Sequence, residues 1–314
     1  MSPSILIAGA TGNTGRSLTE TLPTLLKNST TLSNHRVIAL TRSLSNPVAQ
    51  QLAKIPGVEV IEQNWIDITA DWLLENSVER AFIASNVSQT QFTEESSFHV
   101  AALRAGVKYV VRISTVEPNV RPDCDAYYPR THWAIETMLS TPEFSALQWT
   151  SLQPNAFTQF MLATSAELIK QYRKTGKQET LRLMSAKDAP VGVIDPYDVG
   201  ILAAYLLVSD DVSKHNKARY VVNGPEDVAG RDIVGMVENY IGTKVEKVVF
   251  KDMSIVESFV APNQLGKNII LTIKHAMDRA WEGKQSVSTT SKEVLEISAP
   301  RRTPADVLKT MLEE

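Results

Sequence analysis

The sequence predicts an α/β fold with a doubly wound parallel sheet and a smaller α/β lobe towards the C-terminus. Three observations predict it. Apolar, β-branched runs alternate with helical patterns through the first half, a glycine-rich turn follows the first run, and the alternation becomes less regular in the second half. Strands that recur with helices between them pair in parallel through right-handed crossovers.

The first half predicts six strands and five helices. The expected strands are 5–8, 36–40, 58–61, 81–84, 109–113 and 149–152. The expected helices are 15–26, 48–55, 72–76, 94–105 and 131–139. This alternation is typical of a Rossmann-type dinucleotide-binding domain, which we expect over residues 1–155.

The second half predicts a smaller lobe over residues 156–314. The expected helices are 157–172, 196–207, 232–241, 263–280 and 305–312, and the expected extended segments are 190–194, 218–222 and 247–250. No linker rich in Gly, Ser or Pro separates the halves. We therefore expect this lobe to pack on the sheet edge as a substrate wall, with some exchange of segments between the two domains.

Composition limits the classes of function. The chain has 314 residues, 43% of them hydrophobic, enough for one large or two closely fused units. A net charge of −3 gives no general attraction to nucleic acid or anionic membranes. Cys124 is the single cysteine, which excludes an intrachain disulfide and fits a reducing compartment. With no signal peptide or membrane-spanning run apparent, we expect a cytoplasmic monomer or homodimer.

A glycine at every third position follows the first strand. Gly9 allows the tight strand-to-helix turn, Gly12 lets a pyrophosphate approach the main chain, and Gly15 lets the helix pack closely on the strand. The helix N-terminus then favours an anion. The motif predicts a dinucleotide phosphate site, with three short polar side chains beside it: Thr11, Asn13 and Thr14.

The end of the second strand indicates which dinucleotide binds. An acidic residue there would accept a hydrogen bond from a ribose hydroxyl, but this strand ends in Leu40-Thr41-Arg42-Ser43. Arg42 offers a guanidinium fork that matches a phosphate group. NADP(H) is therefore the expected cofactor, and the alternative is that Arg42 is a solvated surface residue.

Several segments resemble the NmrA-like branch of the atypical short-chain dehydrogenase/reductase family, over most of the chain. They read IAGATGNTG, ALTRS, GVEVIEQNWID, RAGVKYVVRIST, WTSLQPNAF and VIDPYDVG, and the C-terminal RRTPADVL resembles fungal members. The resemblance implies a nucleotide lobe, a smaller C-terminal lobe and a cleft between them at the carboxyl edge of the sheet. It is specific to a family and not to a reaction.

The resemblance also implies cofactor contacts beyond the glycine motif. Asn64 and Trp65 would lie near the adenine, although relatives often have Gly-Asp where this chain has Asn64. Further contacts would follow along the cofactor, the last three of them near the nicotinamide: Ser85, Asn86, Val87, Pro154, Asn155 and Phe157.

The catalytic pattern of that superfamily is altered here. Its members use Tyr-x-x-x-Lys, in which the lysine lowers the pKa of the tyrosine and holds the nicotinamide ribose. Tyr128 and His132 have this separation, so histidine stands where lysine is expected, and Ser114 stands where a catalytic serine is often found. Either His132 binds the ribose or exchanges a proton, with Tyr128 and Glu136 assisting, or it only packs at the helix start. Pro129 indicates that the helix begins after Tyr128, which weakens the same-face argument.

Other candidates carry weaker signals. His275 lies in the C-terminal lobe and is a candidate for the cleft, and the Asp195/Asp198 pair is expected to cap a helix. No spacing resembles a metal site or a nucleophile elbow, so no metal is expected. The remaining histidines are expected at surface or packed positions: His35, His99 and His215.

Three functions remain open from the sequence. The first is an NADP(H)-dependent oxidoreductase that reduces a C=O, C=C or C=N bond of a small apolar molecule. The second is an NADP(H)-binding redox sensor that regulates a partner protein without turnover. The third is a non-redox isomerase of a biosynthetic pathway that retains the cofactor. The first function is favoured by Phe157, Phe160 and Met161, which would suit an apolar pocket. The second function would need an exposed surface for a partner, and the sequence has no acidic or basic tail that would provide one.

Overall fold

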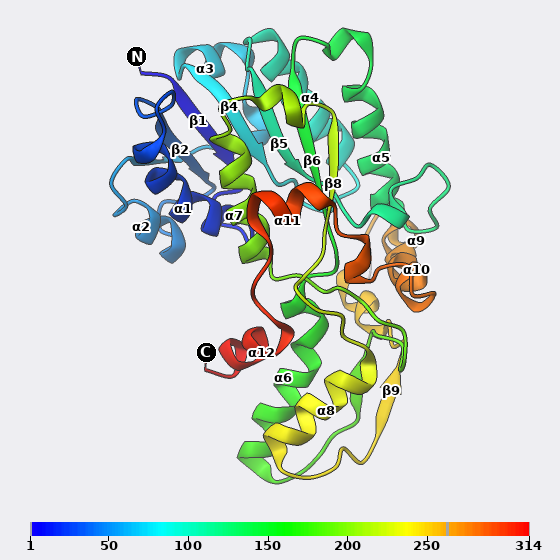
Figure 1. Ribbon diagram of the computed structural model, residues 1–314. Helices are drawn as coiled ribbons and strands as arrows, with labels where there is room; N and C mark the ends of the chain where they lie inside the picture. Colours follow the sequence, from blue (N-terminus) through cyan, green and yellow to red (C-terminus); the bar gives the residue numbers. More distant parts are fainter. Residues whose placement is uncertain (1, 262–263, 314) are drawn as a thin grey trace.

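The computed structural model describes residues 2–261 and 264–313. It has two lobes (Figure 1). The larger lobe contains a seven-stranded parallel sheet in the order β3-β2-β1-β4-β5-β6-β8, and the smaller contains the parallel pair β7-β9. The expected α/β class with a doubly wound parallel sheet is confirmed.

The strands of the large sheet are largely buried, and β1 lies where the strand order reverses. The large sheet consists of β1 (Ser4–Ala8), β2 (Arg36–Thr41), β3 (Val58–Glu62), β4 (Val78–Ile83), β5 (Tyr109–Ile113), β6 (Gln148–Pro154) and β8 (Ala218–Val222). The small sheet consists of β7 (Leu181–Leu183) and β9 (Val248–Phe250). Because β1 pairs with β2 on one side and β4 on the other, the loop after β1 opens at the crevice where ligands bind in such sheets.

Helices cover both faces of the large sheet. One face is covered by α1 (Gly15–Asn28), α2 (Pro47–Leu52), α7 (Pro196–Leu207) and α11 (Lys292–Ser298). The other is covered by α3 (Ala70–Glu75), α4 (Gln91–Arg104) and α5 (Tyr127–Leu139). Each layer buries its own apolar cluster against the sheet. This three-layer packing fixes the ends of β4, β5 and β6 at one edge.

The small lobe has a third apolar cluster. Its helices are α6 (Thr158–Thr175), α8 (Gly230–Ile241) and α12 (Pro304–Glu313), and α9 (Lys267–Ile270) and α10 (Asp278–Trp281) lie between the lobes (Figure 1). The 3₁₀ helices are η1 (Trp65–Asp67), η2 (Glu117–Asn119), η3 (Pro142–Phe144), η4 (Val212–His215), η5 (Ser254–Phe259), η6 (Leu271–Met277) and η7 (Val287–Thr289).

The chain passes between the lobes more than once. After α6 and β7 in the small lobe, α7 and β8 return to the large lobe, and β8 pairs with β6. The chain then builds α8 and β9, returns with α11 and ends with α12 against α6. The expected boundary after residue 155 is therefore crossed repeatedly, with segments exchanged between the two lobes.

Two expected helices differ from the structure. The helix expected over 263–280 is divided into α9, η6 and α10, and Asn263 lies outside the described residues. The Thr272 hydroxyl donates to the Ile269 carbonyl and accepts from the Tyr127 amide, which competes with regular helix geometry. Helix α5 begins at Tyr127, earlier than expected, because a proline is tolerated in the first turn. Strand β7 and helix α11 were not predicted from the sequence.

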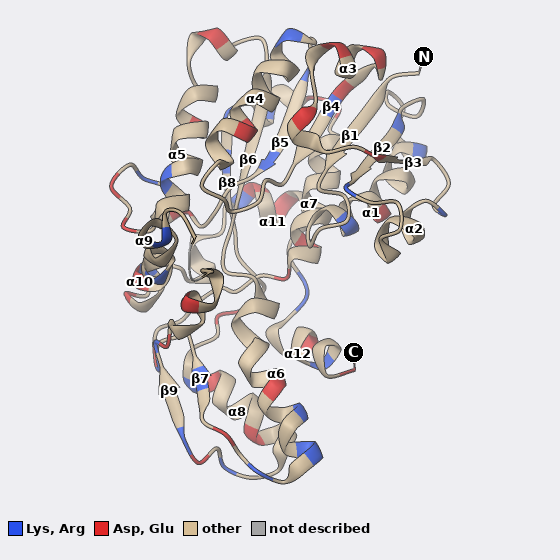
Figure 2. Cartoon of the chain, turned by 180° about the vertical axis from the view of Figure 1, so that it is seen from behind, with Lys and Arg blue, Asp and Glu red and all other residues tan. Residues whose placement is uncertain are grey.

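Charges of both signs are spread over the two lobes. Figure 2 shows Lys and Arg interspersed with Asp and Glu on the helices and loops of each lobe. Among the helices built from the described residues, none combines the length and the apolarity that crossing a bilayer requires.

Candidate functional site

The loop after β1 has the backbone geometry that the glycine spacing predicts. Gly9 has a φ of +94°, and the Gly12 amide donates to the Gly9 carbonyl at 3.0 Å. A Cβ on Gly15 would lie 2.1 Å from the Gly9 oxygen, so only glycine fits there. Thr14 caps α1 and is buried, whereas Gly12 and Asn13 are exposed, and Thr11 is partly exposed. The loop thus presents its main chain to a ligand at the helix start.

The adenosine end of this crevice contains one cation and one carboxylate. Arg42 is exposed and forms no ion pair with another described residue. Glu62, at the end of β3, accepts a hydrogen bond from the Leu44 amide at 2.8 Å, so it holds the loop that carries Arg42. Asn64 is exposed and caps η1, but the Trp65 ring packs edge-on against Phe98 in the core. The Trp65 side chain is therefore not available to stack on an adenine.

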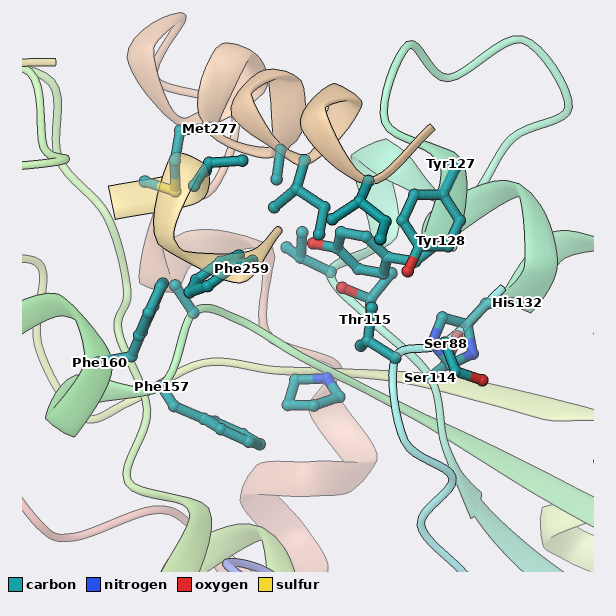
Figure 3. Close-up of a pocket in the computed structure, with 18 of the residues that line it drawn as sticks. Ser88, Ser114, Thr115, Tyr127, Tyr128, His132, Phe157, Phe160, Phe259 and Met277 are labelled. Atoms are coloured by element: carbon teal, nitrogen blue, oxygen red, sulfur yellow. The ribbon is translucent and has the colours of Figure 1, made fainter. Parts of the chain in front are cut away.

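A cavity of about 750 Å³ lies between the lobes. It is built from the ends of β4, β5 and β6, the start of α5, and the segment 264–281 of the small lobe, which we call the cap. Figure 3 shows polar groups gathered around Ser114, Thr115 and Tyr128, with an aromatic and sulfur-containing wall opposite. That wall includes Phe157, Phe160, Phe259 and Met277. No described lining residue is an Asp, Glu, Lys or Arg.

This cavity is lined by most of the candidate residues that lie outside the glycine-rich loop. They are Ser85, Val87, Ser114, Tyr128, His132, Pro154, Asn155 and Phe157. Asn86 is exposed and is not among the lining residues. Residues on three neighbouring strand ends are thus brought together with the first turn of α5, as expected from the parallel sheet.

A fully buried arginine lies behind the cavity wall. The Arg112 guanidinium donates to Glu95 at 2.6 Å, to Ser151 at 2.8 Å and to Glu136 at 3.4 Å. It also lies 2.8 Å from His132 Nδ1. Glu136 was expected to orient His132, but Arg112 holds this position and Glu136 contacts Arg112 instead. The one indication of this role in the sequence is a single arginine within the apolar run 109–113. Its partners lie elsewhere in the chain and are brought to it only by folding.

The contact with Arg112 fixes the state of His132. A guanidinium only donates, so Nδ1 must be the unprotonated ring nitrogen, and the proton of the neutral ring lies on Nε2, which is 3.3 Å from the Gln91 side-chain amide. Burial, followed by the charge of Arg112, lowers the pKa of His132 to about 4. The imidazole is neutral at neutral pH, so this geometry argues against the expected role as a protonated general acid.

Tyr128 and Ser114 are hydroxyl-bearing residues that line the cavity together with this histidine. The Tyr128 and His132 rings meet edge to face with centroids 6.4 Å apart, so both lie on one face of α5. Burial raises the pKa of Tyr128, and the neighbouring Thr115 side chain opposes this shift to a smaller extent. The Ser114 hydroxyl is buried and has no hydrogen-bond partner among the described residues. Both residues thus line the cavity, and the Ser114 hydroxyl is left without a hydrogen-bond partner in its wall.

Asn155 is occupied by contacts within the protein. Its amide group donates to Asn223 at 2.8 Å and to the Gln285 carbonyl at 2.9 Å, and its oxygen accepts from the Ala156 amide. Asn155 therefore positions the segment around Gln285, and its amide hydrogens are not available to a cofactor. Gln285 also lines the cavity, and no sequence pattern indicated this residue.

The other histidines lie outside the cavity. His99 is buried beside Glu95, and His215 contacts the Tyr220 hydroxyl. His275 is not a lining residue; its Nδ1 lies 3.1 Å from Asp278. His275, Asp278 and the exposed Asp125 bring three metal-ligand atoms within 4.8 Å of one another, an arrangement that sequence spacing could not reveal.

The expected helix cap is present. The Asp195 carboxylate accepts from the Tyr197 amide, while Asp198 accepts from the amides of Arg301 and Arg302 and so ties the C-terminal segment to α7.

Comparison with solved structures shows the same fold in proteins of different activity. The chain is similar to the NADPH-dependent quinone oxidoreductase QOR2 of Escherichia coli in complex with NADPH (TM-score 0.72, 18% identity, 98% of this chain and 99% of that chain). It is similar to triphenylmethane reductase of Citrobacter sp. in complex with NADP(H), with a TM-score of 0.69 and 19% identity over 98% of this chain and 100% of that chain. It is also similar to NmrA, a negative transcriptional regulator, with a TM-score of 0.69 and 16% identity over 100% of this chain and 96% of that chain.

Sequence comparison identifies the family. The search of curated proteins gave no match. The family model described as the NmrA-like family matches residues 1–299, which confirms the resemblance seen in the motifs. The chain therefore belongs to the NmrA-like family.

Proposed function

We propose that the protein is an NADP(H)-dependent oxidoreductase that reduces a neutral or cationic, largely apolar acceptor. The observation that carries this proposal is the cavity of about 750 Å³ at the ends of β4, β5 and β6. Its described lining contains hydroxyl groups, amides and a neutral imidazole, but no ionised side chain. Such a lining suits an acceptor without a localised charge such as a carboxylate or phosphate group, because a buried localised charge would find no partner there, whereas a neutral molecule or a delocalised cation would not need one.

The residues around the crevice fit a dinucleotide. The exposed main chain at Gly12 and the start of α1 would hold the pyrophosphate, and Arg42 would hold the 2′-phosphate. The unpartnered Ser114 hydroxyl would face the nicotinamide end. When bound, NADPH supplies the hydride. Two similar proteins are described as complexes with NADPH or NADP(H), which supports this cofactor.

The protonation states of the side chains in the cavity wall restrict which acceptors can be reduced. His132 is neutral, and Tyr128 has a raised pKa, so neither is a strong acid at neutral pH. Acceptors that form a stabilised anion or a neutral product are therefore favoured over simple aldehydes and ketones. Quinones and cationic triphenylmethane dyes meet this condition, and the names of two similar proteins refer to these compounds. We propose that Tyr128 donates a hydrogen bond to the oxygen of a quinone.

The test measures NADPH consumption with 1,4-benzoquinone, the dye malachite green and benzaldehyde. We expect turnover of the quinone or the dye and little with benzaldehyde. Tyr128→Phe should lower kcat for the quinone roughly tenfold and leave the dye, which has no oxygen to stabilise, nearly unchanged. Tyr127→Phe is the matched control, because Tyr127 lines the same cavity one residue earlier. Equal effects of the two substitutions would remove Tyr128 from the reaction.

A regulatory function is the second candidate. It is favoured by His132 in place of the lysine expected at this position, and by the similarity to the regulator NmrA. A protein that binds NADPH but consumes it with none of the acceptors would support this candidate. Turnover of any acceptor at a rate that falls with Tyr128→Phe would exclude regulation as the sole function.

A further inference from the structure

Gln285 places an unpaired amide in the wall of the cavity. The residue is 1% exposed, and its side chain is among those that line the cavity. No hydrogen bond joins its side-chain amide to another described residue. A buried primary amide offers both a donor and an acceptor, and leaving them unmet is unfavourable unless a ligand or water completes them.

The main chain around Gln285 is held firmly. Its carbonyl accepts from the Asn155 side chain at 2.9 Å and from the Gly192 amide at 2.8 Å. The Asp227 carboxylate accepts hydrogen bonds from the Ser286 hydroxyl at 2.7 Å and from the Val287 amide at 2.9 Å. Gln285 is thereby fixed beside the end of β6 before any ligand arrives. An unsatisfied side-chain amide on a firmly held main chain is typical of a binding group.

We infer that the Gln285 side chain binds the carboxamide of the nicotinamide ring, an inference that rests on the proposed function. A primary amide is matched by a group that offers one acceptor and one donor side by side. The nicotinamide carboxamide is such a group, and hydride transfer in this cavity requires that ring to lie there. An apolar acceptor such as a quinone offers oxygen acceptors only and would leave the Gln285 oxygen unpaired.

This contact orients the nicotinamide ring. Two hydrogen bonds to the carboxamide would restrict rotation of the ring about its bond to the ribose, and so would hold the ring in one orientation within the cavity. Gln285 is then a cofactor-binding residue that also controls which face of the ring reacts.

The test is calorimetric and does not depend on turnover. Three ligands are titrated: NADP⁺, its 3-acetylpyridine analogue, which has a methyl group in place of the amide NH₂, and 2′-phospho-ADP-ribose, which lacks the ring. For the wild type, we expect NADP⁺ to bind more tightly than both others. Gln285→Leu should weaken NADP⁺ roughly tenfold, remove its advantage over the analogue, and leave 2′-phospho-ADP-ribose unchanged.

Gln264→Leu is the matched control. Gln264 also lines the cavity, but it is exposed and its side-chain oxygen already accepts from the Ala261 amide. It should alter none of the three affinities. Equal weakening of all ligands by Gln285→Leu would show a structural role and overturn the inference, as would no change at all. If the wild type binds none of the three ligands, both the proposed function and the inference about Gln285 fail.

Discussion

A single buried residue, Arg112, determines the chemistry of the cavity wall. Its guanidinium contacts two carboxylates and His132 in a region that water does not reach. Burying these charges is unfavourable unless they are paired, and here the pairing is nearly complete. The consequence is a histidine that cannot carry a second proton at neutral pH and whose Nε2 already lies 3.3 Å from the Gln91 side-chain amide.

The neutral state of His132 predicts a pH dependence of stability. Its pKa falls from 6.5 to about 4 on folding, so below about pH 6.5 the unfolded chain binds a proton that the folded protein does not. The free energy of unfolding should therefore fall as the pH drops from about 7.5 to about 5. His132→Gln, which keeps an acceptor for Arg112, should reduce this fall by about 2 kcal/mol.

Urea denaturation at the two pH values measures this effect. His99 is also buried with a lowered pKa, so part of the fall should remain in the variant. An identical fall in the variant and the wild type would mean that His132 is not held neutral by its surroundings.

The sequence predicted the candidate site only where spacing carried the signal. The glycines, Arg42, Tyr128 and His132 were found because their chemistry depends on nearby positions. The role of Arg112 depends on Glu95 and Glu136, which only folding brings to it. The unpaired state of Gln285 likewise follows from packing and leaves no mark on the sequence.

At the scale of elements, the packing of α1 against α7 supports the phosphate-binding loop. A Cβ on Gly200 would lie 2.1 Å from the Ser17 hydroxyl and 2.2 Å from the Thr14 carbonyl, so the two helices approach closely. The Ser17 hydroxyl donates to the Tyr197 carbonyl at 2.8 Å across this contact. Since Thr14 is the N-cap of α1, this contact also positions the helix start.

Gly200→Ala should therefore be costly. We expect a loss of about 3 kcal/mol in the free energy of unfolding, because backbone atoms must move to admit the methyl group. Gly235→Ala, in α8, is the matched control: no atom lies near its Cβ position, so this variant should be about 0.5–1 kcal/mol more stable than the wild type. Chemical denaturation of both variants tests this, and equal stability of Gly200→Ala and wild type would contradict it.

Elements with a strong repeating pattern were predicted well, and those stabilised by tertiary contacts were not. The expected helix over 196–207 and strand over 218–222 agree with α7 and β8, because α7 begins at a proline behind the capping Asp195 and is apolar along its length, and β8 buries Tyr220 and Val222 on one face. The three-residue strand β7 is defined mainly by its pairing with β9, and the cap is shaped by contacts with the loop before α5. Neither contact is visible in local sequence.

At the scale of the whole molecule, the candidate site is assembled from segments far apart in the chain. The loop after β1 and the ends of β4, β5 and β6 come from the first half, whereas the cap and Gln285 come from residues 264–285 (Figure 1). The side chain of Gln89, in the loop after β4, donates to the carbonyls of Leu265 and Gly266 and so joins the nucleotide side to the cap. The parallel sheet edge and the apolar residues Phe157, Phe160 and Met161 were predictable, but the cap and Gln285, which complete the wall, were not.

Calorimetric titration of the wild type and Arg42→Ala with NADPH and NADH tests the central claim most directly, that the crevice after β1 binds a 2′-phosphorylated dinucleotide. The wild type should bind NADPH more tightly than NADH, and Arg42→Ala should weaken NADPH by roughly ten- to a hundredfold while leaving NADH nearly unchanged. Absence of binding by either dinucleotide, or tighter binding of NADH by the wild type, would contradict the account.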